Sequence, residues 1–285
     1  MSTGENEFEQ WIGRTETVCD DLTIAPILAM SAMLDKESLT YAEGDQLPPL
    51  WHWLFFLNPA KQSNLAKDGH PERGDFLPPI PLPRRMWAGS RFDFHHPLSI
   101  GENISRQSTI KKITFKEGRS GKLAFVCVRH EISNLHGLAI SEEHDIVYRS
   151  HAPADTSPPL SKPAPKNYDF SKSVNPDPVL LFRYSALTFN GHRIHYDRDY
   201  VTQEEGYPGL IVHGPLLATF MVELFADYFP EKQLTKFEFT AMEPVFDLDP
   251  FHVCGLNPDK KNAAELWIKN HTGSLCMKGL ATISQ

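Results

Sequence analysis

The stretch YPGLIVHGPLLATFMVELFADYF, residues 207–229, decides the fold of this chain. Its large apolar residues recur at helical spacing, and they are Leu216, Leu217, Phe220, Met221, Leu224, Phe225 and Tyr228. Gly214-Pro215 supplies the helix start, because proline is favoured at the first helical position. Few polar residues interrupt the run, so the segment predicts a deeply buried helix.

Strand-like segments follow this helix, and the first half of the chain repeats the order. The predicted strands of the second half are 236–246, 249–257, 262–274 and 275–284. In the first half the apolar burst LPPLWHWLFFL (47–57) precedes 85–98, 102–118, 122–134 and 138–150. The shared order indicates an internal duplication, although two unrelated α+β segments would give the same comparison. A helix wrapped by an antiparallel sheet is an α+β arrangement, and two copies could join their sheets edge to edge.

A proline-rich segment separates the two halves. Residues 151–178 carry seven of the 23 prolines and few apolar side chains, so they predict an extended linker. The expected organisation is a first repeat over 1–150 and a second repeat over 179–285.

Composition points to an ordinary intracellular globular protein. The net charge of -8 gives no sign of a nucleic-acid surface. The four cysteines are far apart and form no CxxC pair, which argues against a disulfide framework or a cysteine-rich zinc site. The acidic N-terminus lacks the features of a signal or transit peptide, and no apolar run approaches a membrane span. We therefore expect a cytoplasmic protein with no membrane association.

The polar stretch LTFNGHRIHYDRDY, residues 187–200, carries the candidate chemistry. His192 and His195 would share a helix face, but Gly191 disfavours a helix and no H-E-x-x-H is present, so a metal site is disfavoured. No G-x-S-x-G turn surrounds Ser185, which argues against a serine nucleophile. A solvated loop explains His192 and Arg193 equally well, and His213 has a structural alternative at the turn before the helix.

General acid–base catalysis fits His195 better. An imidazole titrates near neutrality, and the Gly214 N–H at the start of the buried helix would offer an oriented donor at a positive dipole end. Such a pair suits a reaction that passes through an oxyanion, such as a thioester enolate. The spacing of the two residues does not establish that they meet.

FNGHRIHYD followed by GYPGLIVHGP resembles the hydratase motif of the MaoC-like hotdog family. RRMWAGSRFDF in the first half resembles the branch that contains mesaconyl-CoA and itaconyl-CoA hydratases and type 2 hydroxyacyl-thioester dehydratases. The motif covers about 30 residues, and the repeated helix-then-strands order extends the likeness over most of the chain. The resemblance implies a double hotdog fold and hydration or dehydration of an acyl thioester.

The resemblance also implies roles for individual residues. The family motif runs aspartate, four residues, histidine; the histidine falls on His195 and the aspartate position on Asn190. The family's oxyanion donor falls on the Gly214 N–H. Asparagine cannot take a proton at neutral pH, but its amide can orient a water. The implied mechanism therefore has His195 as the acid–base group, Asn190 as the water orienter and Gly214 on the thioester oxygen.

The expected substrate is a C5 dicarboxylyl-CoA, with itaconyl-CoA or mesaconyl-CoA giving a hydroxyacyl-CoA such as citramalyl-CoA. Its free carboxylate needs a cation, and the candidates for substrate binding are Arg84, Arg85, Arg183, Arg193 and His213. The first repeat lacks the motif and is expected to be a degenerate copy. No metal and no cofactor beyond the substrate's coenzyme A are expected. An acyl-carrier-protein dehydratase and a non-catalytic acyl-CoA-binding module stay open, as does a homodimer.

Overall fold

The computed structural model describes residues 6–37, 40–118, 121–150 and 161–284. Its helices are α1 (Ile24–Met33), α2 (Pro178–Leu187) and α3 (Gly214–Tyr228), with short helical turns at Asn6–Trp11, Trp51–Leu54, Gln62–Asn64, Arg193–His195 and Tyr200–Glu204. Its strands are β1 (Thr15–Asp21), β2 (Arg84–Phe94), β3 (Asn103–Gly118), β4 (Gly121–Asn134), β5 (Gly137–Arg149), β6 (Phe170–Val174), β7 (Leu234–Ala241), β8 (Phe251–Gly255), β9 (Ala263–Lys269) and β10 (Leu275–Ile283). All eight predicted strands are confirmed, as is the helix that begins at Gly214.

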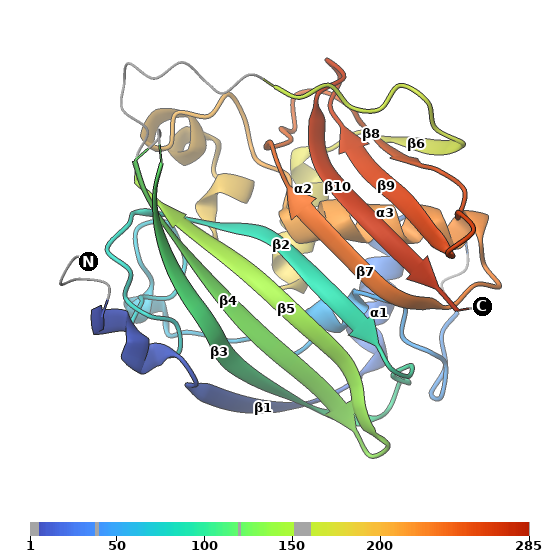
Figure 1. The fold of residues 1–285 in the computed structure, drawn as a ribbon, viewed down its shortest axis with the longest axis horizontal. Helices are drawn as coiled ribbons and strands as arrows, with labels where there is room; N and C mark the ends of the chain where they lie inside the picture. Colours follow the sequence, from blue (N-terminus) through green and yellow to red (C-terminus); the bar gives the residue numbers. More distant parts are fainter. Residues whose placement is uncertain (1–5, 38–39, 119–120, 151–160, 285) are drawn as a thin grey trace.

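One ten-stranded sheet runs through the whole molecule. Its order is β1-β3-β4-β5-β2-β7-β10-β9-β8-β6, so the second five strands repeat the order of the first five in reverse. Strands β2 and β7 pair antiparallel at the centre and join the two halves edge to edge. Figure 1 shows the sheet curving around the helices, with α3 behind the strands of the second half. The predicted double hotdog is therefore confirmed, including the edge-to-edge junction.

Helix α3 lies in the core of the second half. All ten residues of its central stretch, 216–225, are buried, as the nearly unbroken apolar run predicts. Gly279 on β10 lets the strand approach the helix, because a Cβ there would lie 3.2 Å from the Met221 side chain. The buried Glu223 of α3 accepts a hydrogen bond of 2.7 Å from Trp51 Nε1 of the first half. The two repeats therefore share a core as well as a sheet.

The first repeat differs from the prediction at its central helix. Segment 47–57 forms only the four-residue turn Trp51–Leu54, whereas a helix was predicted there by analogy with α3. Leu50 and Phe56 on either side have φ values of 70° and 57°, a left-handed conformation that does not continue a right-handed helix. The ten-residue helix of this half is α1, which follows β1 as α2 follows β6.

The prediction of a linker over 151–178 is wrong for the part that the structure describes. Strand β6 lies inside it and pairs with β8 through the register from Phe170↔Gly255 to Val174↔Phe251. Phe170 and Val174 are buried, and the edge of β8 supplies the hydrogen-bond partners that a local reading of the segment cannot anticipate. Asp177, at the end of the segment, caps α2 by accepting a 2.7 Å hydrogen bond from Leu180 N. Residues 151–160 lie outside the described residues.

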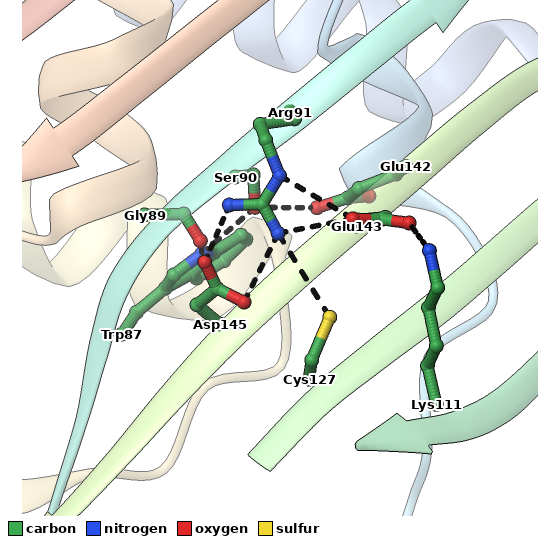
Figure 2. Close-up of polar contacts among 9 residues, drawn as sticks. All are labelled: Trp87, Gly89, Ser90, Arg91, Lys111, Cys127, Glu142, Glu143 and Asp145. Atoms are coloured by element: carbon green, nitrogen blue, oxygen red, sulfur yellow. Dashed lines mark hydrogen bonds and ion pairs between the residues drawn. The ribbon is translucent and has the colours of Figure 1, made fainter. Parts of the chain in front are cut away.

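Strand β2 separates two different polar environments on its two faces (Figure 2). On the outer face the exposed Arg91 pairs with Glu143 and Asp145 of β5. On the inner face Ser90 donates a 3.0 Å hydrogen bond to Glu142, which is only 3% exposed. The inner face of the first repeat thus carries buried polar groups next to the sheet.

All four cysteines are free thiols, as expected. None of the helices in the described part of the chain has both the length and the apolar character that a membrane crossing requires.

Candidate active site

His195 is a buried imidazole with a defined tautomer. It ends the short turn Arg193–His195 and is only 7% exposed. Its Nδ1 lies 2.7 Å from the carbonyl oxygen of Ile211. A carbonyl can only accept, so Nδ1 carries the proton and Nε2 keeps a lone pair. Burial lowers the pKa of His195 to about 4, against the opposing effect of the Ile211 hydrogen bond. The ring is therefore a neutral base at physiological pH.

A second buried histidine brings the start of α3 to this ring. His213 is the residue before Gly214, and its ring stacks on that of His195 with centroids 3.7 Å apart. Its Nε2 lies 2.8 Å from Ser185 Oγ on α2. Its Nδ1 has no hydrogen-bond partner among the described residues. The motif segment and the helix start, which the sequence could not place together, thus meet through two stacked rings.

Gly214 leaves its surroundings open. A Cβ at this position would meet no atom within 4 Å. No residue in the described ranges accepts a hydrogen bond from the Gly214 N–H. A free N–H at the positive end of a 15-residue helix is the kind of donor that stabilises an oxyanion. The arrangement therefore offers a base at His195 and an anion-stabilising donor beside it.

Asn190 takes part in the turn that builds the motif. Its Oδ1 accepts a 3.0 Å hydrogen bond from His192 N, and its own N–H donates to Ser185 O. The carbonyl end of the side chain is thus occupied, and the amide Nδ2 is the end that remains to donate to a water. No direct hydrogen bond joins Asn190 to His195 within the residues that the structure describes.

The four candidate arginines have very different partners. Arg84 pairs with Glu205, and Arg193 pairs with Asp197 and lies over the Tyr200 ring. Arg183 is exposed on α2. Arg85 is partly buried on the inner face of β2, opposite Tyr148 of β5. Only this last guanidinium combines partial burial with the absence of a carboxylate partner among the described residues.

Arg85 lies close to the histidines of the site. Burial lowers the pKa of both His70 and His192, and the positive charge of Arg85 acts in the same direction on each. Because no carboxylate among the described residues pairs with it, Arg85 is the candidate cation for a substrate carboxylate.

The loop around Gly69, in the first repeat, packs against the motif segment at His192, which the sequence did not predict. Asp68 and His70 lie against His192, with the His70 and His192 rings 4.0 Å apart. Asp68, His70 and His192 place one ligand atom each within 4.8 Å of one another, a spacing that a metal ion could use. The only local signal is an Asp-Gly-His triplet in a polar loop, which does not indicate where in the fold the loop docks.

Comparison with known proteins identifies the family. Residues 50–247 match the family model described as hydroxyacyl-thioester dehydratase type 2. The chain belongs to the type 2 hydroxyacyl-thioester dehydratase family. Members of this MaoC-like family are hydro-lyases, so the chain is an enzyme of the hydratase and dehydratase type, as the motif resemblance predicted.

Two curated relatives of this dehydratase family cover nearly the whole chain. Mesaconyl-C(4)-CoA hydratase of Chloroflexus aurantiacus is 52% identical over 87% of this chain and 88% of its own length. The mitochondrial type 2 hydroxyacyl-thioester dehydratase of Schizosaccharomyces pombe is 30% identical over 90% of this chain and 93% of its own.

Solved structures support the fold of this dehydratase-family chain. A MaoC-like dehydratase from Phytophthora capsici superposes with a TM-score of 0.70 over 99% of both chains at 14% identity. A Mycobacterium tuberculosis protein described as having a double hotdog fold superposes with a TM-score of 0.60 over 96% of both chains at 12% identity.

Proposed function

We propose that this enzyme hydrates an enoyl-CoA whose β-carbon bears a free carboxylate, the class to which mesaconyl-C(4)-CoA belongs, with no cofactor beyond the substrate's own coenzyme A. The observation that carries the proposal is a neutral, proton-accepting His195 beside the Gly214 N–H, which has no acceptor among the residues that the structure describes. The 52% identity to mesaconyl-C(4)-CoA hydratase supports the substrate class.

The proposed reaction uses His195 to move one proton. Nε2 removes a proton from a water as its oxygen bonds to the β-carbon, and the thioester becomes an enolate whose oxygen accepts from the Gly214 N–H. The imidazolium then returns that proton to the α-carbon. The hydroxyl stays on the β-carbon, so one water is added in total. A neutral imidazole suits this cycle, because it must accept a proton before it donates one.

Arg85 supports a dicarboxylate substrate. In mesaconyl-C(4)-CoA the free carboxylate is attached to the carbon that water attacks, so its cationic partner must lie within a few ångströms of the base. The positive charge of Arg85 lowers the pKa of His70 and His192, and the His192 ring lies 5.5 Å from the His195 ring. Arg84 and Arg193 already neutralise Glu205 and Asp197.

A second candidate function is dehydration of a 3-hydroxyacyl thioester, including one carried by acyl carrier protein. The family match and the 30% identity to the Schizosaccharomyces pombe dehydratase favour it. The same base and donor serve this reverse reaction. The higher identity to mesaconyl-C(4)-CoA hydratase, 52% against 30%, places this function second.

A panel of enoyl-CoA substrates tests the proposal. We expect loss of enoyl absorbance with mesaconyl-C(4)-CoA, slower turnover of crotonyl-CoA, and a fall in kcat of about 10²–10⁴-fold in His195→Gln with an unchanged melting temperature. Itaconyl-CoA in the same panel shows whether the enzyme also accepts the isomeric C5 thioester. Faster turnover of long linear enoyl chains would contradict the substrate class, and wild-type inactivity on every thioester would favour a binding module.

A further inference from the structure

We propose that His70, oriented by Asp68, is a second catalytic residue of this site, contributed by the first repeat to hold the attacking water. The inference rests on the proposed hydratase function. It assigns a role to a repeat that the sequence predicts to be a degenerate copy, and it identifies a group that can replace the carboxylate missing at Asn190.

The loop that carries His70 docks against the motif segment by specific backbone contacts. Arg193 N donates to Asp68 O at 2.9 Å, and Arg193 Nη1 donates to Lys67 O at 3.1 Å. Gly69 has φ +87°, and a Cβ there would lie 1.9 Å from Gly191 O. Only glycine allows this approach, so the sequence itself is adapted to hold the two loops together.

Asp68 orients the His70 ring. Its two carboxylate oxygens accept hydrogen bonds from His70 N and His70 Nδ1, each at 3.0 Å. Burial opposes ionisation of Asp68, but the hydrogen bonds from His70 outweigh it and lower the pKa of the carboxyl group. An ionised Asp68 accepts the Nδ1 proton, which leaves the lone pair on Nε2. His70 and His195 thus have the same tautomer, because Nδ1 donates to a carboxylate in His70 and to a carbonyl in His195.

The rings of His70 and His195 both lie near the His192 ring. The His70 ring is 4.0 Å from the His192 ring, which is 5.5 Å from the His195 ring at an interplanar angle of 89°. His70 and His195 also interact electrostatically. In the proposed arrangement, a water bound by Nε2 of His70 and Nε2 of His195 directs one hydrogen to each nitrogen and keeps a lone pair for the β-carbon. His195 takes one hydrogen as a proton, and the hydrogen that faces His70 stays on the product hydroxyl.

Kinetics of four variants test this assignment. We expect His70→Ala to lower kcat for mesaconyl-C(4)-CoA and for crotonyl-CoA by about 10²-fold, with KM within about twofold of wild type. His70→Gln, which keeps an acceptor, recovers part of kcat. Asp68→Asn lowers kcat about tenfold. The double variant Asp68→Asn/His70→Ala is no slower than His70→Ala, because Asp68 acts through His70. Melting temperatures confirm that each variant folds.

The matched control is His95→Gln, in the same repeat. His95 is exposed, and its ring hydrogen-bonds with Ser141, away from the histidines of the site, so kcat should stay at the wild-type value. Wild-type kcat in His70→Ala would overturn the assignment, as would losses from Asp68→Asn and His70→Ala that multiply in the double variant. Turnover abolished by a chelator and restored by Zn²⁺ would also overturn it, in favour of a metal on Asp68, His70 and His192. Inactivity of the wild type on all thioesters would instead contradict the proposed function.

Discussion

At the scale of single residues, hydrogen-bond partners sort the candidates more sharply than residue type does. His195 and His213 are adjacent rings, yet only His195 has a carbonyl that assigns its Nδ1 proton. Arg84 and Arg85 are neighbours in sequence, but successive side chains of β2 point to opposite faces of the sheet. Arg84 therefore pairs with Glu205, whereas Arg85 lies opposite Tyr148. Arg84 stabilises a contact between the repeats, and Arg85 remains as the cation for a substrate carboxylate.

Substitution of Arg85 should change specificity more than activity. We expect Arg85→Gln to lower kcat/KM for mesaconyl-C(4)-CoA by about 10- to 100-fold, the value of one charge-assisted hydrogen bond, and to leave crotonyl-CoA within about threefold. Steady-state kinetics on both substrates measure the ratio. Arg183→Gln, an exposed control, should leave both rates unchanged. An equal loss on the two substrates in Arg85→Gln would mean that Arg85 supports the fold or the coenzyme A.

At the scale of elements, the site lies where a loop of one repeat meets a turn of the other. The turn 190–195 is held from one side by Ile211 and from the other by the loop around Gly69. Neither segment belongs to a long helix or strand, so their geometry depends on mutual packing. The rigid elements nearby, α2 and α3, contribute Ser185 and the free Gly214 N–H.

A pair of glycine substitutions tests the importance of this contact. Gly69→Ala combines a left-handed conformation with a collision against Gly191 O. Gly44→Ala carries a comparable φ of +91° but no atom within 4 Å of the new Cβ. We expect Gly44→Ala to cost about 1 kcal/mol of stability at unchanged kcat. Gly69→Ala should cost more and lower kcat about tenfold or more, measured by urea denaturation and by turnover; equal effects of the two would contradict the tight contact.

At the scale of the whole molecule, both halves bury polar groups beside their apolar cores. The first half buries His52 and Glu142, and the second half buries His195, His213 and Glu223. Burial lowers the pKa of His130 to about 3 and that of His144 to about 4. The pKa of Glu142 falls to about 2, because hydrogen bonding to its carboxylate outweighs its burial. Neutral histidines and an ionised carboxylate thus coexist in one core.

This interior makes stability depend on pH. Below pH about 6.5 these histidines are protonated in the unfolded chain but stay neutral in the folded protein. The free energy of unfolding therefore falls as the pH drops from 6.5 towards 4. Glu142 adds a loss in the same direction, from about pH 4.5 down to about 2. Each histidine whose pKa falls to about 4 contributes on the order of 3 kcal/mol of this change.

Urea denaturation at several pH values between 7.5 and 4.5 checks this expectation. The midpoint should fall steeply below pH 6.5 in the wild type. His144→Phe, which keeps a ring stacked on Trp87, should flatten the dependence, whereas the exposed His136→Gln should not. A wild-type midpoint that stays constant from pH 6.5 to 4.5 would show that these histidines are protonated in the folded protein.

Local pattern predicted much of this architecture for a physical reason. The period of 3.6 in 214–228 and the alternation in the strands record which side chains are buried, and burial is the main term in folding. Prediction from local pattern was wrong at 47–57, because two residues with positive φ prevent a longer helix there. It was also wrong at 170–174, because the hydrogen-bond partners of this strand come from the distant strand β8. The role of His195 was predicted because FNGHRIHYD resembles the family motif, not because of its distance in sequence from Gly214.

By itself, the sequence determined the buried helix and the duplicated strand order, because both depend on short-range spacing and hydrophobic period. The double hotdog, the family and the role of His195 followed from the resemblance of the motif to a known family. The tertiary structure was needed for three further features. These are the tautomer of His195, the lack of a carboxylate partner for Arg85 among the described residues, and the position of Asp68 and His70 beside His192. These features depend on contacts between segments that are distant in the chain. One example is the contact between Gly69 and Gly191, which are more than a hundred positions apart. The role of LTFNGHRIHYDRDY therefore becomes clear only with the loop of the first repeat in place.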